Sequence, residues 1–282
     1  MRMPPATRRK LEKLRADLSG MGKVLIAFSG GTDSTLLLKV AAEELGPGVL
    51  AVTASSKTYP GREIAAARRL ARGFGVRHRV IRTSELDNPE FRANPPLRCY
   101  HCKRELFQDL RRIARDEGIP HVVDGSNSDD LSDYRPGARA GKEFKIRSPL
   151  KEAGLTKAEV RLISRSLRLP TWDKPALACL ASRFPYHHPI DERSLERVGS
   201  AEDALRRLGF KLFRVRHHGT IARIELAPGE IGRLLDGNLR TKISRRLKSL
   251  GYTYISLDLD GYRTGSMNET LKAERRRKAM VF

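Results

Sequence analysis

The sequence lacks long apolar runs, an apolar leader and a large set of cysteines, and each shortage excludes a class of protein. No run in its 282 residues approaches the ~20 apolar residues of a membrane-spanning helix. Residues 1–18, MRMPPATRRKLEKLRADL, are charged throughout and lack the apolar core of a signal peptide. Three cysteines cannot all pair, which favours a metal or redox role over a disulfide framework. We therefore expect a cytoplasmic protein without a membrane segment.

Acidic residues are few relative to basic ones. The chain has 55 Lys and Arg against 33 Asp and Glu, a net charge of +22, and such an excess favours anionic partners. The basic residues are scattered along the chain, and only Arg275–Lys278 forms a short block. The charge therefore suits a small anionic substrate as well as RNA or DNA, and of these we expect the small substrate.

The most informative stretch is VLIAFSGGTDS, residues Val24 to Ser34. A run suited to a buried strand leads directly into Ser29–Ser34, and a helix-compatible run, Thr35–Ala42, follows at once. Two adjacent glycines allow positive φ and let phosphate oxygens approach the main chain. The amides at the start of the helix then face the anion. The stretch is not a Walker A loop, because no Gly-Lys-Ser/Thr follows. It predicts a phosphate-binding loop of another kind.

Strands and helices alternate through residues 1–172, which we expect to form one domain. The loop after the first strand then lies at the carboxyl edge of a parallel sheet with helices on both faces, where such folds bind ligands. Thr156 and Glu159 predict a capping box for a helix that we interpret as structural. The predicted strands are Val24–Phe28, Val49–Thr53, Val76–Ile81 and His121–Asp124, and the predicted helices are Thr7–Leu18, a helix ending at Leu45, Arg62–Phe74, Lys103–Glu117 and Leu155–Leu169.

Residues 173–189 are rich in proline and small side chains and predict no regular element, so they form a linker or an active-site loop. Residues 190–282 predict a small α/β domain with a mainly antiparallel sheet. Its predicted elements are a helix at Asp191–Leu208, strands at Lys211–Arg216 and Thr220–Leu226, one or two helices in Pro228–Leu250, and a strand at Tyr252–Leu259.

An acidic segment, Asp124–Gly137, follows the predicted fourth strand. Asp129, Asp130 and Asp133 lie close together in it, beside Arg135. Carboxylate oxygens are the ligands that Mg²⁺ prefers, so this cluster predicts a site for Mg²⁺ or for positioning a substrate. A polar surface loop is the alternative.

The cysteines allow three interpretations. Cys99 and Cys102 form a C-x-x-C, whereas Cys179 lies in an irregular segment near Arg183, which favours a thiolate. The first is an iron–sulfur cluster with one iron left open, since such a cluster normally takes four thiolates. The second is tetrahedral zinc with a histidine as fourth ligand. The third is Cys179 alone as a nucleophile. The histidines considered for zinc are His101, His187 and His188.

Four segments together resemble one family. They are SGGTDS at residues 29–34, RCYHCK at 98–103, KPALACLASRFPY at 174–186 and DLDGYRTGSMNE at 258–269. They are similar to the LarE-type ATP-dependent sulfur transferases of the PP-loop ATP pyrophosphatase superfamily, and the resemblance runs from about Lys10 to Glu269. The family adenylates a carboxylate of a pyridinium dicarboxylate mononucleotide and replaces AMP by sulfur, during biosynthesis of the nickel-pincer nucleotide cofactor of lactate racemase.

The resemblance implies cofactors and partners. In single-cysteine members the position of Cys179 surrenders its own sulfur. The added Cys99 and Cys102 match the branch in which three cysteines hold a [4Fe–4S] cluster with an extra sulfide. The chain is therefore expected to use ATP, Mg²⁺, the cluster, a small anionic nucleotide substrate and a sulfur donor, and to form a homo-oligomer, a hexamer in the family.

The expected site residues follow from the motifs and the resemblance. Asp33 and Cys179 are the expected catalytic residues, and Cys99, Cys102 and Cys179 the expected metal ligands. The residues expected to bind nucleotide and substrate are Ser29, Gly30, Gly31, Thr32, Asp33, Ser34, Ser55, Asp129, Arg135, Glu202, Arg214, Arg216, Arg223 and Glu225.

Other functions remain as alternatives. A tRNA thiolase also couples a PP-loop with cysteines, and the charge of +22 favours it, although no appended RNA-binding module is recognisable. An amide-forming synthetase of the NAD or GMP type needs ammonia and no cysteine. A regulatory protein could keep the nucleotide pocket without the chemistry. The cysteines and the CLASRFPY segment favour the sulfur transferase.

Overall fold

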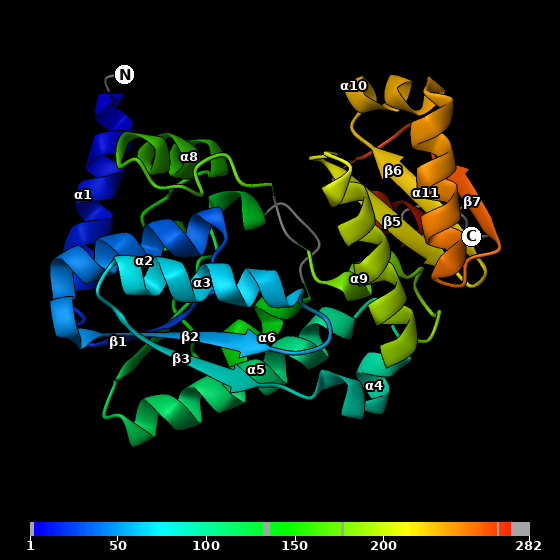
Figure 1. The fold of residues 1–282 in the computed structure, drawn as a ribbon. Coiled ribbons are helices and arrows are strands. Elements are labelled where there is room, and N and C mark those ends of the chain that lie inside the picture. The colour runs from blue at the N-terminus through cyan, green and yellow to red at the C-terminus, as the bar shows by residue number, and fades with distance from the viewer. Residues whose placement is uncertain (1–2, 132–135, 176–177, 264, 272–282) are drawn as a thin grey trace, which may run out of the picture. The chain divides into compact units, whose positions relative to one another are not determined.

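The chain divides into two compact units in the computed structural model, which describes residues 3–131, 136–175, 178–263 and 265–271 (Figure 1). The first unit contains residues 1–91 and 96–177, and the second contains residues 92–95 and 178–282. The division falls inside the segment 173–189, so residues 178–189 belong to the second unit. No helix in the described ranges is long and apolar enough to cross a membrane.

A four-stranded parallel sheet forms the centre of the first unit, as predicted. Its order is β3-β2-β1-β4, so β1 lies inside the sheet and β3 at an edge. Parallel neighbours need crossover connections, and the helices between the strands supply them. The strands are β1 (Val24–Ala27), β2 (Val49–Ser55), β3 (Arg77–Arg82) and β4 (His121–Val123).

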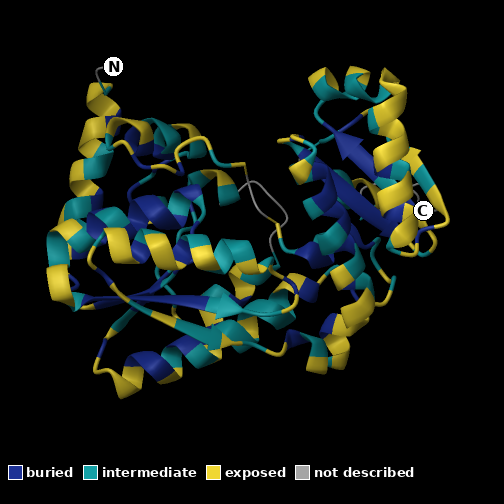
Figure 2. Cartoon of the chain, viewed as in Figure 1, coloured by how far each residue is buried: buried dark blue, intermediate teal, exposed yellow. Residues whose placement is uncertain are grey.

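Helices cover both faces of this sheet, which confirms the predicted α/β class (Figure 1). Side chains of β1 alternate between the faces: Val24 and Ile26 join one core with α1, α2, α3 and α8, whereas Leu25 joins another with α5. Figure 2 shows β1 and β2 among the most buried elements. The helices are α1 (Pro5–Ser19), α2 (Thr32–Leu45), α3 (Gly61–Gly73), α4 (Pro89–Arg92), α5 (Arg98–Asp116), α6 (Gly137–Glu143), α7 (Pro149–Glu152) and α8 (Lys157–Ser166).

Two helix starts matter for the site. Helix α5 begins at Arg98, earlier than the predicted Lys103. Pro95 and Pro96 lie just before its first turn and prevent the helix from extending further toward the N-terminus. Both cysteines of the C-x-x-C are therefore helical. Helix α8 begins after Thr156, and the predicted capping box with Glu159 is present in full.

The second unit has a mixed three-stranded sheet in the order β5-β6-β7. Strands β5 and β6 are antiparallel, whereas β6 and β7 are parallel, so the predicted antiparallel character holds for one pair. The parallel pair arises because helix α11 crosses over between β6 and β7. The elements are η4 (Leu180–Arg183), α9 (Glu192–Arg207), β5 (Phe213–His218), β6 (Ile221–Leu226), α10 (Pro228–Ile231), α11 (Gly237–Ser249) and β7 (Tyr254–Leu257).

Candidate active site

The loop Ser29–Ser34 joins β1 to α2 at the carboxyl edge of the first sheet. The amides of the first helical residues have no carbonyl one turn earlier to bond, so they remain available to an anion. The side chain of Ser29 bonds to Ser34, with 3.0 Å between their Oγ atoms, and accepts a 3.3 Å bond from the amide of Gly31. The loop is therefore shaped before any ligand arrives.

Glycine is required at two positions around this loop. Gly30 has φ of +67°, and a Cβ on it would lie 3.2 Å from Cβ of Ala67 in α3. A Cβ on Gly125, just after β4, would lie 2.9 Å from the amide nitrogen of Ser34. The loops after β1 and β4 are thus in direct contact. Ser55 ends the neighbouring strand β2 at the same edge of the sheet.

Asp33 has two side-chain partners, one of them a cation. Its carboxylate accepts a hydrogen bond from Nζ of Lys157, the first residue of α8, and a 3.1 Å bond from the Asn127 side-chain amide. Neither partner was predicted. A lysine at the start of a helix is unfavourable, because its charge opposes the helix dipole. This unfavourable position was the one local indication in the sequence that Lys157 has a role other than stabilising α8.

Two carboxylates of the acidic segment, predicted to bind Mg²⁺ or to position a substrate, accept hydrogen bonds from the main chain. Oδ2 of Asp130 accepts a 3.0 Å hydrogen bond from the amide of Asn127, and Oδ2 of Asp129 accepts a 2.9 Å bond from the amide of Lys157. These bonds hold the two loops and α8 around Asp33. Asp133 and Arg135 lie outside the described residues.

The phosphate loop also holds the start of the segment that leads toward Cys179. The Thr32 hydroxyl donates to the carbonyl of Thr171 at 2.8 Å. Nζ of Lys174 donates to the carbonyl of Gly30 at 2.9 Å and forms an ion pair with Glu63 at 2.9 Å. Thr32 is therefore turned toward the protein interior and supports the loop from behind.

Cys99 and Cys102 lie near the start of α5, three residues apart and so on one face of the helix. Cys99 is exposed and Cys102 partly buried. Nδ1 of His101 is 2.8 Å from Glu90, so this zinc candidate has a carboxylate partner. His187 and His188 belong to the second unit. Within the described ranges, three or more metal-binding side chains nowhere gather around one point.

Cys179 belongs to the second unit, where it precedes the short turn η4. Its carbonyl accepts hydrogen bonds from the Ser182 amide at 3.0 Å and from Nη1 of Arg183 at 3.1 Å. Arg183 was expected to favour a thiolate. Its guanidinium is instead matched by Glu202 through two bonds of 2.8 and 2.9 Å, so Arg183 fixes the main chain at Cys179.

The Arg183–Glu202 pair is almost completely buried, with side chains 2% and 3% exposed. Burial opposes ionisation of Glu202, but the charge and hydrogen bonds of Arg183 keep the pKa of that carboxyl below its usual value. Oε1 of Glu202 also accepts a 3.2 Å bond from the Val215 amide. Glu202 therefore acts inside the protein, joining η4, α9 and β5.

The remaining predicted residues share one face of the β5–β6 pair. Arg216 forms two bonds with Glu225, at 2.8 and 2.7 Å, and Nη2 of Arg223 lies 3.3 Å from the same carboxylate. Arg214 stacks on Tyr262, and burial together with the charge of Arg183 lowers the pKa of Arg214. Arg223 also pairs with Asp258, with 3.2 Å between Nη1 and Oδ2.

A pocket of about 180 Å³ opens on this face within the second unit. Arg216, Arg223 and Arg263 contribute cationic groups to its wall, and Ser182 and Ser266 contribute hydroxyl-bearing side chains. Arg223 is 39% exposed and Arg263 37%. These two cations can exchange an internal carboxylate for an incoming anion, whereas Arg216 is held by Glu225.

Comparison with known proteins identifies the family. The asparagine synthase family model matches residues 11–97, which include the phosphate loop. An uncharacterised protein of Synechocystis sp. is 45% identical over 93% of this chain and 98% of its own length. The pyridinium-3,5-bisthiocarboxylic acid mononucleotide synthase of Lactiplantibacillus plantarum is 40% identical over 93% of this chain and 95% of its own length.

A more distant likeness is restricted to part of the chain. The tRNA(Ile)-lysidine synthase of a Bradyrhizobium species is 32% identical over 46% of this chain, and the match spans 36% of that enzyme. The two relatives described above, by contrast, match over 93% of this chain. With the phosphate loop, the three cysteines and these full-length matches, the chain belongs to the LarE family of ATP-dependent sulfurtransferases in the PP-loop superfamily.

Proposed function

We propose that the chain inserts sulfur into a pyridinium dicarboxylate mononucleotide during biosynthesis of the nickel-pincer cofactor. The observation that carries this proposal is the match over nearly the whole length of a pyridinium-3,5-bisthiocarboxylic acid mononucleotide synthase. The phosphate loop with Asp33 and the three cysteines supply the two chemical functions that such a reaction needs, activation of a carboxylate and delivery of sulfur.

In the first half-reaction a substrate carboxylate oxygen attacks the α-phosphorus of ATP. The bond between the α-phosphorus and the oxygen that bridges it to the β-phosphorus breaks. Pyrophosphate leaves with its electrons. The main-chain amides at the start of α2, which follow Gly31, stabilise the negative charge of the departing pyrophosphate. Asp33 would hold Mg²⁺, which would supply positive charge to the departing pyrophosphate. Lys157, which bonds Asp33 in this structure, neutralises phosphate oxygens. A free carboxylate is a poor electrophile, and adenylation gives it a good leaving group.

In the second half-reaction sulfur attacks the activated carbonyl carbon and AMP leaves, which produces the thiocarboxylate. Cys99 and Cys102 fit a metal cluster because two soft thiolate donors lie on one helical face and Cys99 is exposed. A [4Fe–4S] cluster bound by Cys99, Cys102 and Cys179 would supply this sulfur as sulfide. In the sacrificial alternative, Sγ of Cys179 attacks, and loss of the Cα proton with cleavage of the Cβ–Sγ bond leaves dehydroalanine.

The second unit binds the phosphate of the substrate mononucleotide. Arg223 and Arg263 line its pocket, are partly exposed and can form charge-assisted hydrogen bonds to a phosphate. Arg183 and Glu202 hold the chain at Cys179, so they support the sulfur-bearing segment without contacting the substrate.

The decisive experiment is substrate-dependent pyrophosphate release together with mass spectrometry of the product. The purified protein with ATP, Mg²⁺ and the pyridinium dicarboxylate mononucleotide should release pyrophosphate and form the thiocarboxylate. Asp33→Ala should abolish pyrophosphate release and leave iron content unchanged. Pyrophosphate release that persists in Asp33→Ala contradicts the role of the loop.

Iron and acid-labile sulfide analysis of anaerobically purified protein tests the sulfur source. The cluster predicts brown protein with iron and sulfide that are lost in Cys99→Ala/Cys102→Ala. Colourless protein with stoichiometric zinc refutes the cluster. A protein mass lowered by one H₂S after turnover identifies Cys179 as the sacrificed sulfur.

A tRNA thiolase remains the second candidate because of the net charge of +22. A mobility-shift assay with bulk tRNA separates the two. Tight, salt-sensitive binding that turnover requires would replace the small-molecule proposal by this one.

A further inference from the structure

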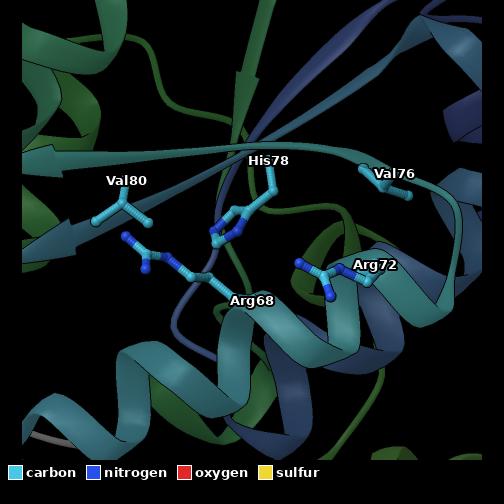
Figure 3. Close-up of a pocket in the computed structure, with 5 residues that line it drawn as sticks. All are labelled: Arg68, Arg72, Val76, His78 and Val80. Carbon is cyan, nitrogen blue, oxygen red and sulfur yellow. The ribbon is translucent and has the colours of Figure 1, made fainter.

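A second basic pocket, of about 430 Å³, lies in the first unit between α3 and the edge strand β3 (Figure 3). Val76, His78 and Val80 line it from β3 and its approach, on one face because strand side chains alternate. Arg68 and Arg72 line it from α3, four residues apart and therefore on one side of the helix. Figure 3 shows the His78 ring extending toward α3, with the two arginines beside it.

Neither arginine forms an ion pair with an acidic residue among the described residues, whereas Arg62, earlier on the same helix, pairs with Glu63. Arg72 lies in the last turn of α3, where the helix dipole favours a cation. The dipole does not account for Arg68, one turn earlier, or for the polar ring of His78 in the same pocket. Two guanidinium groups without acidic partners thus share one concave surface with an imidazole. Such a set of groups can bind an anion through charge-assisted hydrogen bonds.

The tautomer of His78 follows from its neighbours. The Thr53 hydroxyl donates to the carbonyl of Phe28 at 2.7 Å, so its oxygen accepts from Nε2 of His78 at 2.8 Å. Nδ1 is then the ring nitrogen left to accept a hydrogen bond from a ligand. Burial, together with the charge of Arg68, lowers the pKa of His78, which keeps the ring neutral near pH 7.

The pocket lies directly behind the phosphate loop. Phe28, which receives the Thr53 hydroxyl, immediately precedes Ser29. Ala67, in contact range of Gly30, immediately precedes Arg68 on α3. The pocket and the phosphate loop are therefore joined by hydrogen bonds on one side and by packing on the other.

We propose that this pocket binds a hydrogen phosphate group, at a site separate from the phosphate loop. The two guanidinium groups receive its charged oxygens, and its P–OH donates to Nδ1 of the neutral His78 ring. A carboxylate is a poorer match. At neutral pH it has only two oxygens for the two guanidinium groups and no proton to donate to the His78 ring. Sulfate also lacks the proton and requires a protonated His78. The occupant is inorganic phosphate or the monoanion of a phosphomonoester, since both present a P–OH beside charged oxygens.

The test follows the NMR resonances of the His78 ring, assigned by their loss in His78→Gln, during titration with inorganic phosphate near neutral pH. We expect saturable shifts with a Kd of about 1 mM or tighter, and little response to sulfate or chloride. Sulfate should bind as the pH is lowered and His78 becomes protonated. AMP is titrated in parallel. A matching response to AMP identifies a phosphomonoester as the occupant, whereas a response to inorganic phosphate alone identifies the inorganic ion.

The variants separate this site from the phosphate loop. Arg68→Gln/Arg72→Gln should weaken phosphate binding at His78 at least about tenfold, while Arg69→Gln on the same helix should leave it unchanged. Both variants alter exposed side chains, so the fold is retained. A shift relayed from the phosphate loop would persist in the double variant and would overturn the proposal. An absent response, or an equal response to sulfate at neutral pH, would overturn it as well.

Discussion

The two units hold their central ion pairs in different ways. In the first unit Lys157 and Asp33 are 31% and 23% exposed, beside a loop whose amides await an anion. In the second unit Arg183 and Glu202 are 2% and 3% exposed and fully engaged with one another and with the main chain. An exposed pair contributes little to stability and can exchange partners. Removal of one member of a buried pair leaves an uncompensated buried charge and strongly lowers the free energy of unfolding. The ion pair of the first unit can therefore exchange partners, whereas that of the second unit is fixed.

The largest effect should come from breaking the buried pair. Glu202→Gln leaves Arg183 buried without a counter-charge and should lower the free energy of unfolding by about 3–5 kcal/mol. Urea denaturation measures it. Asp203→Asn is the matched control, because this neighbour on α9 forms an exposed pair with Arg206, and it should cost at most about 1 kcal/mol. Equal losses in the two variants would remove the distinction between the units.

The exposed pair should matter for activity instead of stability. Lys157→Gln should lower kcat/KM for ATP roughly ten- to a hundredfold, since it removes charge-assisted bonds to phosphate, while the free energy of unfolding changes by about 1 kcal/mol or less. Lys10→Gln is a close control, because Lys10 forms an ion pair of similar exposure with Glu159 at the same helix terminus. Pyrophosphate release that falls equally in both variants would assign Lys157 a structural role.

The second unit should lose stability in acid through a buried histidine, His217. Burial lowers the pKa of His217 from 6.5 to about 4, so the folded state resists protonation that the unfolded state accepts. The stability from this group is present above pH 6.5 and is lost as the pH falls toward 4. His217→Phe should flatten the decline in urea midpoint over that interval. An unchanged slope would assign the acid sensitivity to other groups.

The smallest effect is expected at the start of α8. Thr156→Ala removes the side-chain cap that accepts the Glu159 amide and should cost roughly 1 kcal/mol in unfolding free energy. Ser166→Ala at the other end of α8 removes only a bond to the carbonyl of Ile163 and serves as the control. A loss of activity in Thr156→Ala larger than its loss of stability would show that the cap also positions Lys157.

Local chemistry decided which of these features the sequence could predict. The phosphate loop and the capping box depend on residues within a few positions of one another, and both were predictable. The contact of Lys157 with Asp33 joins residues 124 positions apart, and no short-range pattern encodes it. The parallel pairing of β7 likewise depends on the path of α11. Glu202 and Glu225 were predicted as ligand contacts from the family resemblance. The structure shows the arginine partners that the sequence did not indicate, Arg183 for Glu202 and Arg216 for Glu225, and the ligand contact stays a prediction.

The bonds from Thr32 to Thr171 and from Lys174 to Gly30 have a consequence for substitutions at these residues. Both tie the phosphate loop to the chain that continues, within five residues of Lys174, to Cys179. A substitution that breaks either bond therefore changes two things at once, the support of the phosphate loop and the anchoring of Thr171 and Lys174.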